Sequence, residues 1–311
     1  MLKNPYICKK FRIVKNFNII LLMLTAVTLV GWIAAGCSGA PPEQKIVTVS
    51  IEPQRYLLEQ ITGDKVQVRC LLSDGANPET YDPSMTHMLN LSNSLGYLRM
   101  GNIGFEAALL DKICESNPDL PIYNTSEGIV PVTGTHGHGE VTHEVTDPHT
   151  WSSVKNARVI ARNMCEAMVE IDPANKDLYR KNHKAFDAHL DSLDRELSTM
   201  LAPVKGSAFL VWHPSLSYFA RDYGLEQIVV GGHEHKEMSV IDLRSMIDEV
   251  KAHGVEVFFS QKDFDSRQVT SVNEEIGARP VEIHPLSYNW ENELRATAAA
   301  LVSSSTKQPE E

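Results

Sequence analysis

The stretch that decides the fold lies near the middle of the chain, at residues 173–202: PANKDLYRKNHKAFDAHLDSLDRELSTMLA. Its apolar residues recur near helical spacing and predict one amphipathic helix: Leu178, Ala185, Phe186, Leu190, Leu193 and Leu197. Pro173 suits the first turn of this helix, because proline is tolerated where the backbone N–H has no helical partner. A helix over about 173–201 would be roughly 40 Å long, enough to span a small domain. We expect it to form a rigid spine between two halves of the protein.

Strand and helix patterns alternate on both sides of the predicted spine. Before it, strand-like runs at 46–51 and 66–72 alternate with helical patterns, and the alternation resumes at 207–211. This order favours mainly parallel sheets covered by helices, so the predicted fold class is α/β with two lobes joined by one long helix. The expected boundaries are an N-terminal lobe at 46–172, a linking helix at 173–202, a C-terminal lobe at 203–303 and a polar tail at 304–311.

The first 36 residues have the features of an export signal. Residues 1–16 contain five basic residues and no acidic one, an apolar run follows at 19–35, and small residues precede Cys37. A cysteine in this position resembles a bacterial lipobox, in which the cysteine is acylated and becomes the new N-terminus. Residues 37–45 would then be a lipidated tether that holds the protein at a membrane surface. The alternative is a signal anchor that stays uncleaved.

Composition excludes several classes of protein. The formal net charge is −11, and cleavage of the signal would make it more negative, which argues against a non-specific nucleic-acid binder. Only one long apolar run is present, so a multi-span membrane protein is excluded. The cysteines beyond Cys37 show no CxxC spacing and indicate neither a disulfide framework nor a cysteine-based zinc site: Cys70, Cys114 and Cys165.

A cluster of histidines lies in a stretch that interrupts the alternation. Residues 124–148 contain four glycines and two prolines, which predicts a loop, and this loop carries His136, His138 and His143. Neutral imidazoles on a mobile tether bind borderline cations such as Zn²⁺, so we expect an auxiliary metal-binding loop. A solvated loop with chance histidines is the alternative.

Two further histidines occupy the ends of predicted elements. His149 precedes a helix in the string DPHTW, and His213 follows a strand in the string VWHPS. In α/β folds, ligands gather at the C-terminal ends of parallel strands. A hydrogen-bonded, half-buried histidine is an equal alternative for either residue alone, but the occurrence of one in each lobe favours a common role.

Motifs of common enzymes are absent. The sequence contains no HExxH, GxSxG, Walker or GxGxxG motif. Asp263 and Asp265 form a carboxylate pair that a solvated turn explains better. His233, His235 and Glu237 form a small cluster, for which a polar loop is a simpler interpretation than an auxiliary metal site.

Four motifs carry a resemblance to a known family: GANPETYDP at 75–83, NIGFE at 102–106, DPHTW at 147–151 and HPSLSYFARDYGL at 213–225. They resemble the solute-binding lipoproteins of zinc and manganese ABC transporters, the TroA/ZnuA-like group, and the resemblance covers nearly the whole chain. A short histidine-rich loop before the Asp-Pro-His motif is typical of the zinc-specific members. The resemblance implies two α/β lobes joined by a long helix, with the metal bound between the lobes.

The resemblance also implies metal ligands at matching positions. His149 matches the family's second ligand and His213 its third. The first position, usually a histidine after proline, holds Glu79, and the fourth, usually an acid before Pro-Leu, holds His284. We hypothesise that these departures compensate, which gives three histidines and one glutamate, a set that zinc accepts. The alternative is that Glu79 caps a turn and His284 is an ordinary surface histidine.

The function that the resemblance implies is capture of Zn²⁺ outside the cytoplasmic membrane and delivery to a cognate ABC permease and its ATPase. Three imidazoles and one carboxylate favour Zn²⁺ because Mn²⁺ prefers more oxygen ligands, yet a manganese-binding member is the nearest alternative. A secreted zinc hydrolase and a surface adhesin are the remaining alternatives. We expect a monomer that is not an enzyme, anchored by lipid in the cell envelope on the periplasmic or cell-surface side.

Overall fold

The structure, a computed structural model, describes residues 45–72, 76–78, 81–136, 143–230, 240–261 and 266–305. The expected signal, the tether up to residue 44 and the end of the tail lie outside these residues. Several residues named above also lie outside them: Cys37, Glu79, His138, His233, His235, Glu237, Asp263 and Asp265. Within the described ranges, no helix combines the length and the apolar composition that a membrane span requires.

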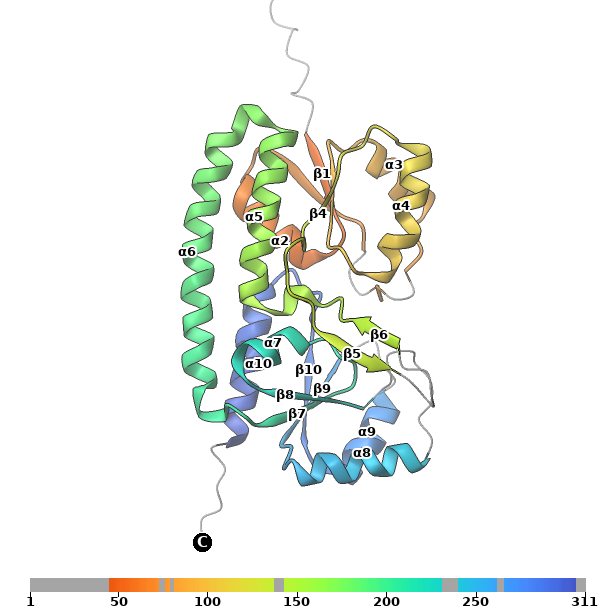
Figure 1. Ribbon diagram of the computed structural model, residues 1–311, viewed down its shortest axis with the longest axis vertical. Helices are drawn as coiled ribbons and strands as arrows, with labels where there is room; N and C mark the ends of the chain where they lie inside the picture. The colour runs from red at the N-terminus through yellow and green to blue at the C-terminus, as the bar shows by residue number, and fades with distance from the viewer. Residues whose placement is uncertain are drawn as a thin grey trace, which may run out of the picture. The chain divides into compact units, whose positions relative to one another are not determined.

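The N-terminal lobe contains a four-stranded parallel sheet. Its elements are β1 (Ile46–Val49), α2 (Glu52–Thr62), β2 (Gln67–Cys70), α3 (Met85–Ser92), β3 (Tyr97–Arg99), α4 (Gly104–Ser116), β4 (Ile122–Asn124) and α5 (Val154–Ile171). The strand order is β2-β1-β3-β4, and all four residues of β1 are β-branched, which suits a buried strand. Helices α2 and α5 pack together beside the sheet, whereas α3 and α4 lie on its other side (Figure 1).

The C-terminal lobe repeats this plan. Its elements are β7 (Ala208–Val211), α7 (Ser217–Tyr223), β8 (Glu226–Val229), α8 (Val240–Ala252), β9 (Val257–Gln261), α9 (Ser266–Ile276), β10 (Arg279–Ile283) and α10 (Trp290–Ser305). The strands are parallel in the order β10-β9-β7-β8. Gly224 ends α7 with a φ of 69°, a left-handed conformation that costs glycine little, and the chain turns directly into β8.

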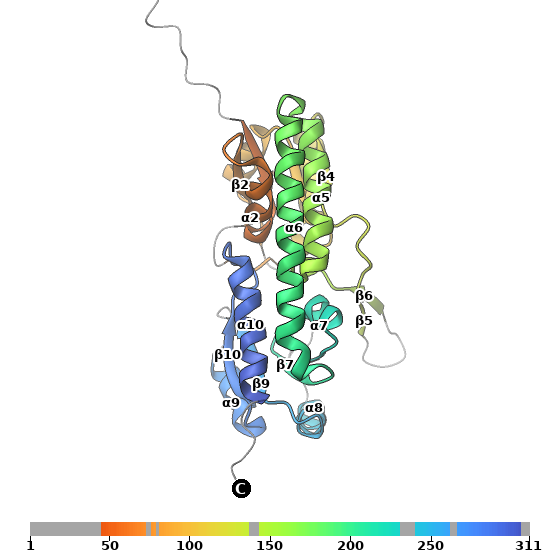
Figure 2. The ribbon, with the colours of Figure 1, turned by 90° about the vertical axis from the view of Figure 1, so that its left-hand side faces the viewer.

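One long helix, α6 (Lys176–Leu201), joins the lobes. Its 26 residues correspond to about 39 Å, and it contacts α2 and α5 of the N-terminal lobe and α10 of the C-terminal lobe. Figure 2 shows α6 running beside helices of both lobes. Four residues of the predicted apolar stripe are buried: Phe186, Leu190, Leu193 and Leu197. Tyr179 and Leu201 are buried as well, whereas Leu178 is half-buried and Ala185 is exposed, so the prediction was wrong for these last two. The predicted fold class, two parallel α/β lobes with a linking helix, is confirmed.

The prediction that residues 124–148 form only a loop is wrong. Two strands, β5 (Thr133–His136) and β6 (His143–Thr146), pair in an antiparallel hairpin within this stretch. The Asp147 N–H donates to the Val132 C=O at 2.9 Å and continues the pairing beyond the hairpin's base. Threonine and valine supply the β propensity here, and the glycines that suggested a loop lie among them.

A buried carboxylate explains the NIGFE motif. Glu106 of α4 is fully buried and accepts hydrogen bonds from the backbone N–H groups of Met100 and Gly101, both at 2.7 Å, and from the Ser50 hydroxyl. Burial raises the pKa of Glu106, although these hydrogen bonds oppose the shift. The carboxylate therefore ties the end of β3 to the start of α4.

A second buried carboxylate marks the junction between α5 and α6. Asp172, whose side chain is 3% exposed, accepts hydrogen bonds from Lys45 Nζ at 2.8 Å, Asn175 Nδ2 at 2.7 Å and Tyr179 Oη at 2.6 Å. Burial alone would raise the pKa of this carboxyl, but the hydrogen bonds outweigh burial and lower it. Asp172 therefore connects Lys45, just before β1, to the start of α6.

We expect Asp172→Asn to lower the free energy of unfolding by about 1–3 kcal/mol at neutral pH, because it weakens hydrogen bonds to a buried charge. The folded-state pKa of Asp172 lies below the unfolded value of about 3.9. Its contribution is therefore present above that pH and is lost as the pH falls through the folded-state pKa. Urea unfolding of both proteins, at neutral and at acidic pH, should show a stability difference that shrinks in acid. Equal stability at neutral pH would contradict this account.

Candidate metal centre

His149 is held by a tight turn at the entrance to α5. It stands just before a short 3₁₀ helix, η1 (Thr150–Ser152), and is only 5% exposed. One oxygen of Asp147, Oδ1, accepts hydrogen bonds from the His149 backbone N–H at 2.7 Å and from its Nδ1 at 2.9 Å. Pro148 restricts the backbone between the two residues. The Asp-Pro-His sequence therefore fixes the orientation of the imidazole ring.

The charge on Asp147 decides which nitrogen of His149 is available. Burial would raise the pKa of the Asp147 carboxyl, but hydrogen bonds and charge from His149, with a hydrogen bond from Ser217, lower it below its ordinary value. An ionised carboxylate can only accept, so the proton of a neutral His149 sits on Nδ1. The lone pair of Nε2 is then left to bind a metal ion or to accept a hydrogen bond.

His213 approaches His149 from the other lobe. It follows the C-terminal end of β7, and its Nε2 lies 3.1 Å from Nε2 of His149. The ring centroids are 4.9 Å apart and the ring planes meet at 80°. Two imidazole nitrogens bound to one tetrahedral zinc ion, each at about 2.0–2.1 Å, would lie about 3.3 Å apart. The separation of the two Nε2 atoms therefore suits a single shared metal ion.

His284 has a carboxylate neighbour of its own. It follows β10, its Nε2 is 3.2 Å from Glu282 Oε1, and its side chain is 48% exposed. In the part of the chain that the structure describes, no group of three or more His, Cys, Asp or Glu is arranged to hold a metal ion. The structure thus brings His149 and His213 together without His284, and the role of His284 as a ligand stays a prediction.

The other candidate ligands lie wholly or partly outside the described residues. The backbone register of the hairpin places His136 directly opposite His143, but the side chains of 134–145 lie outside the described part. Glu79 and His138 lie wholly outside it. Their roles as principal and auxiliary ligands also stay predictions.

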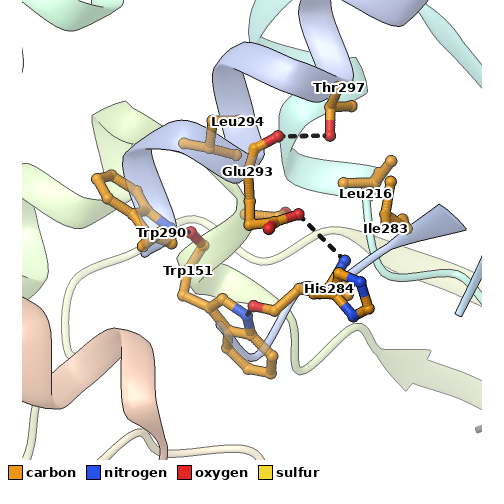
Figure 3. Close-up of a pocket in the computed structure, with 10 residues that line it drawn as sticks. Trp151, Leu216, Ile283, His284, Trp290, Glu293, Leu294 and Thr297 are labelled. Atoms are coloured by element: carbon orange, nitrogen blue, oxygen red, sulfur yellow. Dashed lines mark hydrogen bonds between the residues drawn. The ribbon is translucent and has the colours of Figure 1, made fainter. Parts of the chain in front are cut away.

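Two tryptophans, Trp151 and Trp290, lie close to His284 (Figure 3). Trp151 Nε1 donates to the Pro285 C=O at 2.9 Å, and Trp290 Nε1 donates to the Trp151 C=O at 2.7 Å. Both indoles and His284 line a small pocket of about 20 Å³. The two loops, one from each lobe, are therefore held against each other by reciprocal indole hydrogen bonds.

The sequence interpretation missed the residues that hold the two histidines in place. Asp147 and Trp151 both lie in the DPHTW motif at 147–151. The acidic residue two positions before His149 could have indicated that Asp147 orients the imidazole. Tyr218 also lies inside a motif already singled out, at 213–225, but nothing in that motif indicates its partner: its hydroxyl donates to the Asp147 C=O, 71 residues away, at 2.8 Å. Contacts of that kind depend on how the two lobes pack.

Comparisons with known proteins agree with this architecture. The sequence profile of the family described as "Zinc-uptake complex component A periplasmic" matches residues 47–303. The crystal structure of a ZnuA deletion mutant with zinc bound is 34% identical, covers 86% of this chain and all of that chain, and superimposes with a TM-score of 0.78. A crystal structure of ZnuA is 33% identical over 84% of this chain and 99% of that chain, with a TM-score of 0.77. The high-affinity zinc uptake system protein ZnuA of Bacillus subtilis is 26% identical over 261 residues, 81% of each protein.

Proposed function

This chain belongs to the family of periplasmic zinc-uptake complex component A, whose members are metal-binding components of ABC uptake systems. From this membership, we propose that it captures Zn²⁺ outside the cytoplasmic membrane. It delivers the ion to a cognate ABC permease and its ATPase and acts in transport, not as an enzyme. The observation that carries the proposal is the pair formed by His149 and His213, whose Nε2 atoms lie 3.1 Å apart. Neutral imidazole suits Zn²⁺ better than Mn²⁺, which prefers oxygen ligands.

We propose that Glu79 and His284 complete the coordination shell, because two imidazoles fill only half of a tetrahedral site. The reciprocal tryptophan hydrogen bonds support this proposal, since they hold the loop after His284 beside the loop after His149. To bind the metal, the His284 side chain would have to break its contact with Glu282, and both side chains of this contact are about half exposed. Even a charged pair contributes at most about 1 kcal/mol when it is exposed, so little opposes the rearrangement.

The test is a competitive calorimetric titration of the chain from Ser38 onward with Zn²⁺ and Mn²⁺. We expect one tight zinc site and weaker binding of Mn²⁺. Glu79→Ala and His284→Ala should each weaken zinc binding at least by the roughly 10–100-fold that removal of an outer-shell partner causes. No tight zinc site, or a preference for Mn²⁺, would contradict the proposed function. Unchanged affinity in both variants would contradict only the proposed ligand set.

The same titration distinguishes the principal site from the auxiliary one. We propose that His136, His138 and His143 bind further zinc weakly, supported by the register that sets His136 opposite His143. A chain without residues 136–143 should lose the weak binding and keep the tight site. His253→Ala, which changes an exposed histidine at the end of α8, is the matched control and should alter neither.

We propose that acylated Cys37 anchors the protein at the membrane surface, after cleavage of residues 1–36. The basic segment, the apolar run and the small residues before Cys37 support this proposal. Cys37→Ala should abolish incorporation of labelled fatty acid and shift the protein out of the membrane fraction. Labelling that persists in the variant would show that the anchor lies elsewhere.

A further inference from the structure

The hydroxyl of Tyr218 bridges the two ends of the histidine-bearing hairpin. Tyr218 is fully buried in α7 of the C-terminal lobe, and its hydroxyl donates to the Asp147 C=O at 2.8 Å. The same hydroxyl accepts from the Val132 N–H at 3.3 Å. Val132 precedes β5 and Asp147 follows β6, and the Asp147 N–H also donates to the Val132 C=O at 2.9 Å. A side chain from one lobe therefore completes the base of a hairpin in the other.

A chain of polar contacts leads from the C-terminal sheet to His149. Gln227 of β8 donates to the Ser217 hydroxyl at 2.8 Å, and it also accepts from the Leu216 N–H at 2.9 Å. Ser217 in turn forms a hydrogen bond with the Asp147 carboxylate, which receives both N–H groups of His149. Because Asp147 Oδ1 accepts from both the backbone N–H and the Nδ1 of His149, the carboxylate has little freedom to turn away from the imidazole.

The same short segment carries the other histidine. Ser217 and Tyr218 come four and five residues after His213. The chain between them begins with a tight turn in which the Ser215 N–H donates to the His213 C=O at 2.7 Å, and the Leu216 N–H is held by Gln227. Movement of the His213 segment would therefore also disturb the hydrogen bonds on Asp147. The two histidines are linked through protein contacts and do not need the metal to bring them together.

From these contacts, we propose that Asp147 is a positioning residue that fixes the ring orientation and the Nδ1–H tautomer of His149, and that Ser217 and Tyr218 hold Asp147 from the opposite lobe. The proposal rests on the proposed zinc-binding function of His149 and His213. In this arrangement the Nε2 lone pair of His149 points at the metal position before the ion arrives. Carboxylate partners of metal-binding histidines commonly act in this way, and their removal costs about 10–100-fold in metal affinity.

The experiment compares two matched pairs of variants in the chain from Ser38 onward, which contains every described residue. The first pair is Asp147→Ala and Tyr218→Phe, and the control pair is Asp172→Ala and Tyr179→Phe. The controls remove another buried aspartate and a fully buried tyrosine hydroxyl that donates to it at 2.6 Å, away from both histidines. Zinc affinity is measured by competition with a chelator, and folding is checked by circular dichroism and thermal unfolding.

Asp147→Ala should weaken zinc binding by about 10–100-fold, and Asp147→Asn should recover part of the loss because its amide oxygen can still accept from His149. Tyr218→Phe should lower the affinity by a smaller factor. The control variants should unfold at lower temperature without a change in affinity. Nitrogen-15 shifts of the metal-free protein should report the Nδ1–H tautomer of His149, and a mixture of tautomers in Asp147→Ala.

The outcomes separate this proposal from the proposed function. If the unmodified chain binds no zinc tightly, the proposed function fails. If it binds zinc tightly and folded Asp147→Ala binds equally well, or if His149 carries its proton on Nε2, the positioning role of Asp147 is wrong. If the control variants lose as much affinity as Asp147→Ala, the effect reflects general destabilisation, and the proposal is again overturned.

Discussion

Replacement of His149 by alanine is expected to weaken zinc binding by more than about 100-fold, the upper end of the loss caused by removal of an outer-shell partner. His149 would supply a coordinating nitrogen directly, and its ring is already oriented by two hydrogen bonds to Asp147. Replacement of His213 should have an effect of similar size, because its Nε2 faces the same point from the other lobe. Competition with a chromogenic chelator at neutral pH measures both losses.

The appropriate control is an exposed histidine outside the proposed metal centre. His253, at the C-terminal end of α8, has Nε2 3.7 Å from Glu226 and an exposed side chain. His253→Ala should retain the affinity of the unmodified protein. If His149→Ala and His213→Ala also retain it while remaining folded, the two facing imidazoles are not the zinc site.

Trp151→Ala is expected to lower the free energy of unfolding by about 3–5 kcal/mol, the range for truncation of a large buried aromatic side chain. The indole is 2% exposed, and its Nε1 donates to the Pro285 C=O across the lobes. Its removal would leave a cavity and an unpaired backbone carbonyl beside the loop that holds His149. Urea unfolding of the metal-free protein, followed by far-UV circular dichroism, measures the loss without relying on tryptophan fluorescence.

Two further variants test the cause of this loss. Trp151→Phe keeps an aromatic ring and loses the hydrogen bond to Pro285, so its loss should fall between those of the unmodified protein and Trp151→Ala. Trp212→Ala changes a half-buried tryptophan that packs against the separate apolar cluster of the C-terminal sheet, and it should cost less. A loss for Trp151→Ala no larger than that for Trp212→Ala would show that the contact between the loops contributes little to stability.

Local patterns in the sequence determined the architecture of this protein. The alternation of strands and helices predicted two parallel lobes, and the apolar spacing in 173–202 predicted the spine, because burial on one face of an element imposes a repeat that neighbouring residues display. His149 and His213 were candidates because they lie at the ends of predicted elements, where ligands gather in α/β folds. The hairpin of β5 and β6 was not predicted, since its few β-favouring residues lie among glycines.

The tertiary structure decided which atoms meet. His149 and His213 are 64 residues apart and face each other only because the lobes pack together, and Tyr218 reaches Asp147 by the same packing. His284, predicted as a ligand from its motif, lies half exposed beside Glu282 in this structure, and its role at the metal stays a prediction. A sequence pattern reports the burial and conformation of each segment, whereas a binding site requires side chains from distant segments to converge. That convergence depends on the packing of whole lobes, and no local repeat records it.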